Sequence, residues 1–277
     1  MTMIGTRPRS ASLVIGAVLV GLVVLAALVS FLWTPHDPLL VEANARLLGP
    51  TADYVLGTDR FGRDVVSQLM VGARTTLYVG IVAVGIAAVI GTPLGVLAGM
   101  SRNWLGELVM RANDLMLAFP ALLLAIMLGA VYGASTLTAM IAIGIATIPS
   151  FARIARSGTL RVMSTEYVLA ARAAGRSRLW IAWRHVLPNI SGLVLVQSSV
   201  SFAIAVLAEA ALSFLGFGTR PPTPSWGRML QESQELLAIA PRLALVPGIA
   251  IAIAVLGFNL LGDGLRDRFD PKLEARR

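Results

Sequence analysis

The 277-residue sequence contains no cysteine and only two histidines, His36 and His185. Without cysteine the chain has no disulfide, no thiolate metal site and no thiol chemistry. Charged residues are also scarce, at 14% of the chain, whereas a soluble domain carries about 25%. Apolar residues make up 56% and gather in blocks long enough to cross a bilayer. We therefore predict a membrane protein.

Residue sets suited to catalysis are missing as well. The GxxxxGK[ST] loop that holds nucleotide phosphates does not occur, so any ATP must bind on another chain. The serines have no base beside them, and the two histidines fall on opposite membrane faces in the topology predicted below. We expect no catalytic, cofactor-binding or metal-binding residue on this chain and no enzymatic activity of its own.

Five apolar blocks indicate the membrane spans, at residues 13–33, 77–100, 115–148, 190–217 and 243–262. The first is longer than the apolar core of a signal peptide, about 7–15 residues, and is predicted to be a retained helix. The third is too long for one span and is predicted to hold two short ones, joined by a turn at 132–135. The prediction is an all-α polytopic membrane protein with six transmembrane helices.

The distribution of arginine and lysine predicts the orientation, because cytoplasmic loops carry an excess of both. With the N-terminus inside, the inner segments 1–12, 101–114, 149–189 and 263–277 hold 16 of the 23 basic residues, and the outer segments hold 7. Both termini are therefore predicted to be cytoplasmic. The net charge of +8 is explained by this bias, and no nucleic acid is expected as a partner.

The chain divides into three predicted parts: a tail with the first transmembrane helix (1–33), an extracytoplasmic segment (34–76), and a core of five transmembrane helices (77–277). In the middle part, Phe61, Val65 and Leu69 share one helical face. We expect a short interfacial helix there, capped by Thr58 or Asp59, that leads into the second span.

Two features inside the spans carry further predictions. Gly91, Gly95 and Gly99 recur every four residues on one face, which favours close approach of a second helix. Glu209 is an ionisable residue near the outer end of the fifth span, and such residues are usually functional. It either pairs with a neighbouring helix or contacts the substrate path.

The stretch "YVLAARAAGRSRLWIAWRHVLPN" (167–189) carries four arginines, a histidine and no acid. Its alanines favour helix, and Gly175 suits a helix end that turns through a left-handed conformation. A second helical pattern follows and ends at Leu187 and Pro188, with Trp180 and Trp183 predicted to lie against the membrane. The result is a cytoplasmic hairpin within 150–189. Taken alone, its arginines could equally contact anionic lipid heads.

The spacing in this stretch resembles the EAA-x3-G-x9-I-x-LP signature of ATP-binding cassette (ABC) importer permeases. Ala170, Ala171 and Gly175 match it, as do Leu187 and Pro188, while Leu169 replaces its glutamate and His185 its isoleucine. The segments 56–80, 208–230 and 259–271 are similar to signatures of the dipeptide/oligopeptide/nickel branch. The resemblance covers nearly the whole chain and implies a C-type permease subunit with the type I importer fold.

The resemblance also implies which residues couple transport to ATP. The hairpin would dock into a groove on a cytoplasmic ATPase, and the residues assigned to this coupling are Glu166, Leu169, Ala170, Ala171, Gly175, His185, Leu187 and Pro188. ATP and Mg²⁺ would bind on two partner ATPase subunits. The other implied partners are a paralogous permease subunit, an extracytoplasmic binding protein and membrane lipid.

By resemblance the chain takes up dipeptides or oligopeptides across a bacterial plasma membrane. Nickel chelates, glutathione and haem are alternative substrates of the same branch. An autonomous secondary transporter is the alternative from another class, but it needs coupling charges near mid-bilayer and usually internal repeats, and neither is evident. The proline-rich loop "GTRPPTPSWGRMLQESQE" either docks the binding protein or packs as a plug on its own subunit.

Overall fold

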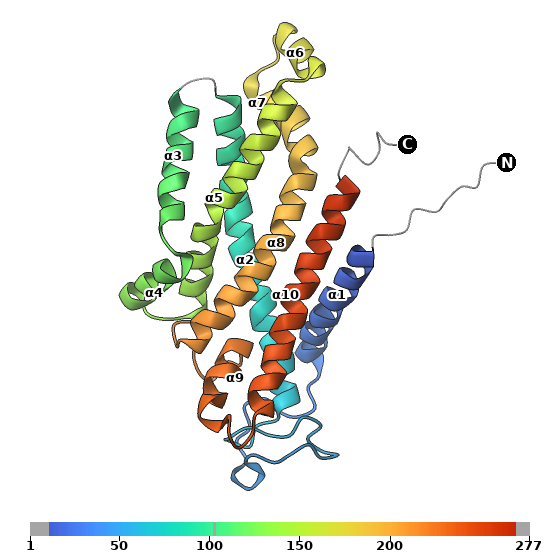
Figure 1. Cartoon of the computed structure of the whole chain (residues 1–277), viewed down its shortest axis with the longest axis vertical. Helices are drawn as coiled ribbons and strands as arrows, with labels where there is room; N and C mark the ends of the chain where they lie inside the picture. The colour runs from blue at the N-terminus through green and yellow to red at the C-terminus, as the bar shows by residue number, and fades with distance from the viewer. Residues whose placement is uncertain (1–10, 102–103, 270–277) are drawn as a thin grey trace, which may run out of the picture.

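The computed structural model describes residues 11–101 and 104–269 (Figure 1). The described residues are mostly helical, with no strand beyond an isolated bridge between Thr58 and Asp64. Their α-helices are α1 (Ala11–Leu32), α2 (Val65–Met100), α3 (Trp104–Ala118), α4 (Ala121–Tyr132), α5 (Thr136–Met163), α6 (Glu166–Ala173), α7 (Arg178–Ile181), α8 (Leu187–Phe214), α9 (Trp226–Ser233) and α10 (Arg242–Phe269). Short 3-10 turns occupy Ala43–Ala45 and Gln234–Leu236. The predicted all-α class is confirmed.

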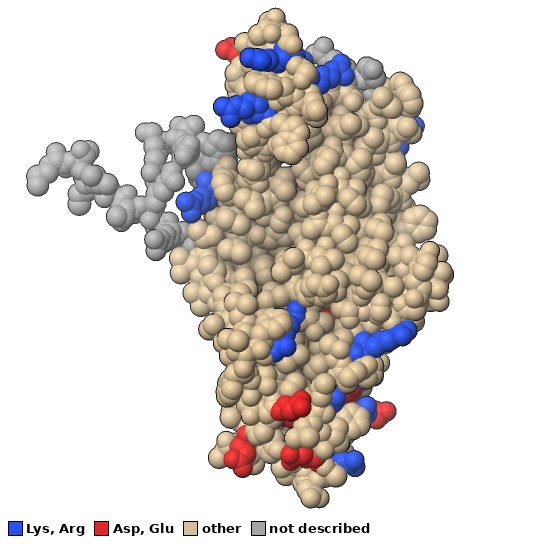
Figure 2. Space-filling model, turned by 180° about the vertical axis from the view of Figure 1, so that it is seen from behind, with Lys and Arg blue, Asp and Glu red and all other residues tan. Residues whose placement is uncertain are grey.

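The helices form an elongated bundle with two different ends. α6 and α7 project from one end, called here the hairpin end (Figure 1). Residues 34–64 form a lobe at the opposite end, called here the lobe end, where α9 also lies. Charged side chains gather toward the two ends, and the broad band between them is nearly free of charge on the face that Figure 2 shows. This pattern is that of a bundle that crosses a bilayer.

Five helical stretches are long and apolar enough to cross a membrane: α1, α2, α5, α10 and the continuous run Arg178–Phe214 that includes α8. The third predicted span is instead broken into α3 and α4, whose axes differ by 79°. The break falls at Phe119 and Pro120, because proline disfavours the helical conformation of the residue before it. Six spans result if the bent pair counts as one.

The predicted interfacial helix at the lobe end does not exist as a separate element. α2 begins at Val65 and continues through the predicted span to Met100. Its N-cap is Asp64, whose carboxylate accepts from the Val66 and Ser67 amides, so the predicted caps at Thr58 and Asp59 are wrong. A left-handed Gly62, at φ +80°, separates Asp59 from the helix.

The predicted close approach of the α2 glycines is confirmed, and the partner is α5. A Cβ on Gly91 would lie 2.6 Å from the Ile148 carbonyl, and one on Gly99 2.7 Å from the Thr159 side chain. A Cβ on Gly95, which lies between them, would stand 2.7 Å from the Ala155 Cβ. The two helices therefore pack backbone against backbone.

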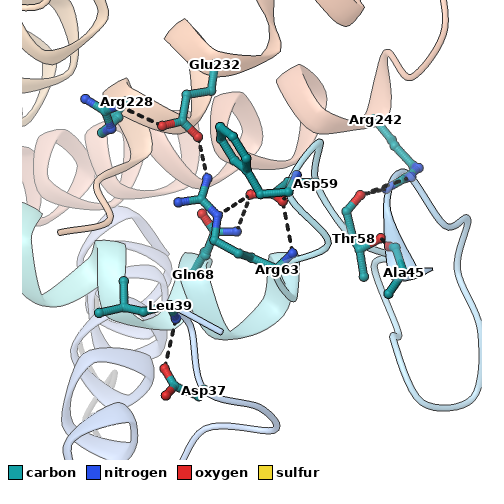
Figure 3. A network of polar contacts seen from close by, with 11 residues as sticks. Asp37, Leu39, Ala45, Thr58, Asp59, Arg63, Gln68, Arg228, Glu232 and Arg242 are labelled. Atoms are coloured by element: carbon teal, nitrogen blue, oxygen red, sulfur yellow. Dashed lines mark hydrogen bonds and ion pairs between the residues drawn. The ribbon is translucent and has the colours of Figure 1, made fainter. Parts of the chain in front are cut away.

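A polar network fastens the lobe to the last two helices (Figure 3). Arg63 lies between two carboxylates, 2.6 Å from Asp59 and 2.5 Å from Glu232, and all three side chains are at most 13% exposed. Arg228 pairs with the same Glu232 at 2.9 Å. Arg242, at the start of α10, donates to lobe carbonyls, among them Leu48 O at 2.6 Å. The lobe is therefore held by charge-assisted hydrogen bonds to α9 and α10.

Candidate functional site

The candidate site is the helix–turn–helix at the hairpin end. α6 ends in a Schellman turn, in which the Gly175 amide donates to Arg172 O over 3.0 Å and the Arg176 amide to Ala171 O over 3.1 Å. Gly175 has φ +75°, the left-handed conformation that the sequence predicts. Ser177 caps α7 by accepting from the Trp180 amide. Residues 150–163, which the prediction included in the hairpin, form the last part of α5.

One side of the hairpin is anchored in the bundle. Val168, Ile181 and Val186 are at most 1% exposed and pack in one cluster with Val96 of α2 and Ala155 of α5. Trp180 and Trp183, predicted to lie against the membrane, are 38% and 69% exposed on this chain, and their contact with the membrane stays a prediction. Branched aliphatic side chains of the hairpin therefore pack against α2, α5 and α8.

The opposite side of the hairpin is open. Glu166, Leu169, Ala170 and Gly175 are exposed, and a Cβ on Gly175 would meet no atom of this chain within 4 Å. Ala171 is half-buried and packs against the anchor cluster. Four of the predicted coupling residues are thus accessible on this chain: the charged Glu166 and the small or apolar Leu169, Ala170 and Gly175.

The remaining predicted coupling residues lie at the base of the hairpin. His185 is half-buried between two aromatic rings, with centroids 5.4 Å from Tyr167 and 5.1 Å from Trp180. The Arg176 guanidinium lies 4.9 Å from the Trp180 ring centroid. These contacts join α6, the turn and the second arm, so His185 braces the hairpin from inside.

A π-helical turn, Ala182–Val186, connects the hairpin to α8. Pro188 has no amide hydrogen for the Arg184 carbonyl, and its ring crowds that carbonyl. The Leu187 amide donates to Ala182 O, five residues back, and the Asn189 side chain donates to His185 O over 2.6 Å. Through this turn the second arm continues into α8 without a loop, so displacement of the hairpin acts directly on a membrane-spanning helix.

At the lobe end, the proline-rich loop packs on its own subunit. Trp226 is 2% exposed, and its indole N–H donates to the Leu69 carbonyl of α2 over 2.9 Å. Thr75 of α2 donates to the Pro224 carbonyl over 2.9 Å. The loop therefore packs on its own subunit, and docking of a binding protein on it stays a prediction.

Glu209 lies beneath this loop and is 1% exposed. Its Oε1 accepts from the Ser213 hydroxyl at 2.7 Å and from the Thr219 hydroxyl at 3.4 Å, while Ser213 Oγ accepts from the Thr219 amide at 3.0 Å. The partners lie on α8 itself and on the loop after it, not on the neighbouring helix that was predicted, and the carboxylate does not reach the surface of the chain. A role in the substrate path stays a prediction.

Sequence reasoning missed several residues that shape the two ends. The Arg63 bridge and the Arg242 tether join residues more than 150 positions apart, and no local pattern identifies such pairs. The Glu209–Ser213 pair could have been found, since residues four apart share a helix face.

Comparisons with known proteins relate this arrangement to a family. The sequence profile described as "binding-protein-dependent transport system inner membrane component" matches residues 91–275. The dipeptide transport system permease protein DppC of Alkalihalophilus pseudofirmus is 41% identical over 95% of this chain and 86% of its own length. The glutathione transport system permease protein GsiD of Pectobacterium atrosepticum is 40% identical over 94% of this chain and 88% of its own length.

A solved structure supports the same assignment at the level of fold. The MetNI methionine ABC transporter in an inward-facing conformation matches with a TM-score of 0.62 and 18% identity, over 73% of this chain and 96% of that chain. The bundle and its hairpin therefore define a multi-pass permease subunit with the type I ABC importer fold. The chain belongs to the family of binding-protein-dependent transport system inner membrane components. The predicted family and fold are confirmed.

Proposed function

We propose that this permease takes up dipeptides and oligopeptides as one half of a heteromeric ABC importer. Support comes from the relatives, several of which are named as dipeptide, di/tripeptide or peptide transport permeases at 41–42% identity. Glutathione, itself a tripeptide, is the second candidate, because a glutathione permease is 40% identical over most of the chain.

The observation that carries the proposed mechanism is the two-sided hairpin. Its buried side is fixed to α2, α5 and α8, and its other side presents Leu169, Ala170 and Gly175 to solvent. We infer that a cytoplasmic ATPase receives this open surface. ATP and Mg²⁺ bind on the ATPase pair, whose closure moves the hairpin and biases the bundle toward one of its two access states.

The other proposed partners follow from the same assignment. A paralogous permease completes the translocation path, and an extracytoplasmic binding protein delivers substrate at the lobe end. The lobe and the packed plug give that protein a preformed surface, because the Arg63 network and Trp226 hold both in place. The chain itself carries no ATPase site in this proposal.

Uptake by the reconstituted complex tests the substrate. Proteoliposomes that hold the permease pair, the ATPases and the binding protein are expected to accumulate a labelled dipeptide only when ATP is supplied to the ATPase side. Unlabelled di- and tripeptides should compete, and glutathione should compete more weakly. Competition by glutathione alone would replace the peptide assignment with the second candidate, and accumulation without ATP would overturn the ABC mechanism.

The orientation gives a prediction that needs no substrate. Because the chain has no cysteine, a single cysteine at exposed Ser164, beside α6, should react with an impermeant maleimide only from the cytoplasmic side. One at exposed Ala52, in the lobe, should react only from outside. The reverse pattern would invert the topology, and labelling of both from one side would contradict an odd number of spans between them, which are α2, the bent α3–α4 pair and α5.

Glu209 gives a second prediction. Glu209→Gln is expected to lower the free energy of unfolding by about 1–3 kcal/mol, because the new amide group is a buried donor at the carboxylate oxygen that has no hydrogen-bond partner. Uptake of matched lysine-containing and alanine-containing peptides should fall equally when the complex is present in equal amounts. A loss confined to the lysine peptide would place Glu209 in the substrate path.

A further inference from the structure

A basic groove lies between α3, at Met110 and Asp114, and the half of α5 nearer the hairpin end. The open space measures about 540 Å³ and is lined by Met110 and Asp114 of α3 and by residues of α5 that include three arginines. Arg153, Arg156 and Arg161 lie on one side of α5 and span about 12 Å at 1.5 Å per residue. The proposed coupling and substrate binding use none of these side chains.

The charges in the groove are unbalanced. Asp114, its one acidic lining residue, pairs with Arg153 at 2.6 Å. Within the described part of the chain, Arg156 and Arg161 form no ion pair, and the buried Arg156 Nε has no hydrogen-bond partner. The groove therefore presents two guanidinium groups to an anion from outside the chain.

The position of the groove across the bilayer indicates which kind of anion it binds. Residues 136–152 of α5 carry no charge and span about 25 Å, close to the hydrocarbon thickness of about 30 Å. Arg153 therefore stands where the hydrocarbon core ends and headgroups begin. Met110 and half-exposed Leu160 give the groove an apolar lining beside the arginines. A phosphodiester attached to acyl chains matches both parts, because guanidinium forks bind phosphate oxygens in pairs.

We propose that the α3–α5 groove binds the headgroup of an anionic phospholipid such as phosphatidylglycerol. Basic pockets between transmembrane helices on the cytoplasmic side bind such lipids in other membrane proteins. The site rests on α5 crossing the bilayer and is independent of the transported substrate. The lipid bound in this groove would hold α3 against α5 close to the break at Pro120. The two helices themselves make few polar contacts with each other there.

Native mass spectrometry of the full-length chain, with the partners that co-purify, measures this binding directly. The sample is titrated with phosphatidylglycerol or with phosphatidylcholine of identical acyl chains. Wild type should retain phosphatidylglycerol preferentially. Arg156→Gln and Arg161→Gln should each weaken binding of the first phosphatidylglycerol molecule about fivefold. This factor corresponds to the roughly 1 kcal/mol that one arginine near the membrane surface contributes to binding an anionic lipid. Asp114→Asn should strengthen binding, because it frees Arg153 for the ligand.

The control is Arg46→Gln, which removes the same single charge from the lobe and should bind phosphatidylglycerol like wild type. Millimolar inorganic phosphate should leave the lipid in place, because phosphate has no acyl chain to pack against the apolar lining of the groove. The proposal is overturned if the groove variants retain phosphatidylglycerol unchanged, or if phosphate displaces it. It is also overturned if these variants lose a partner subunit rather than lipid, which would make the groove a protein interface.

Discussion

Gly175→Asp is expected to reduce ATP-driven uptake at least tenfold while the subunit still inserts and assembles with its partner permease. Gly175 is exposed, and no atom of this chain lies within 4 Å of its missing Cβ, so the aspartate causes no clash inside the subunit. The left-handed turn costs a non-glycine residue roughly 1 kcal/mol. The large effect comes from a charged side chain placed where a close-packed ATPase groove must fit. Uptake and ATP hydrolysis, measured on the same proteoliposomes, should become uncoupled.

The matched control lies at the other end of the bundle. Gly216 has φ +85° and is also exposed, so Gly216→Asp carries the same charge and a similar backbone cost away from the hairpin. It should retain most of the uptake. Gly175→Asn separates bulk from charge at the hairpin, because asparagine tolerates the left-handed conformation. Normal coupled uptake by Gly175→Asp would show that the hairpin is not the coupling element.

Gly95→Leu is expected to prevent accumulation of folded subunit. A Cβ at Gly95 would lie 2.7 Å from Ala155 Cβ and 2.9 Å from the Arg156 amide nitrogen, and the leucine adds three further carbons. Overpacking of a tight core costs typically about 1–3 kcal/mol. The cost here should reach or exceed the upper end, because the neighbouring atoms belong to the α5 backbone and cannot move as a side chain does. Detergent-solubilised yield and thermal unfolding of the tagged subunit measure the effect.

The same helix supplies the control for this change. Gly85 also lies in α2, yet nothing approaches its missing Cβ within 4 Å. Gly85→Leu should therefore yield folded subunit at close to the wild-type level. Equal losses for Gly85→Leu and Gly95→Leu would mean that α2 tolerates no added bulk anywhere, and close packing against α5 would not be the cause.

Long apolar runs and small-residue spacing predicted much of the fold because both are local signals. Helices α1, α5, α8 and α10 match predicted spans, and the spacing of Gly91, Gly95 and Gly99 predicted a helix contact. The break at Pro120 and the fusion of the interfacial segment with α2 were missed. Pro120 and Gly62 each change the backbone at a single position. A prediction based on long apolar runs does not detect the effect of a single residue.

The hairpin was predictable for the same reason, since its turn depends on Gly175 and neighbouring alanines. Its anchoring was not, because Val168 and Ile181 bury themselves against α2 and α5 through contacts that only the folded bundle creates. Contacts between distant segments, as in the Arg63 bridge to Glu232, likewise appear only in three dimensions.

Site-specific photocrosslinking from the hairpin tests the coupling mechanism most directly. A photoreactive phenylalanine at Leu169, which is 51% exposed on α6, is introduced into the intact complex, and a second variant carries it at Val55, which is 65% exposed in the lobe. We predict a crosslink to the ATPase from Leu169 and none to the ATPase from Val55. Absence of an ATPase adduct from Leu169, in a complex that still contains the ATPase, would contradict the assignment of this hairpin as the coupling element.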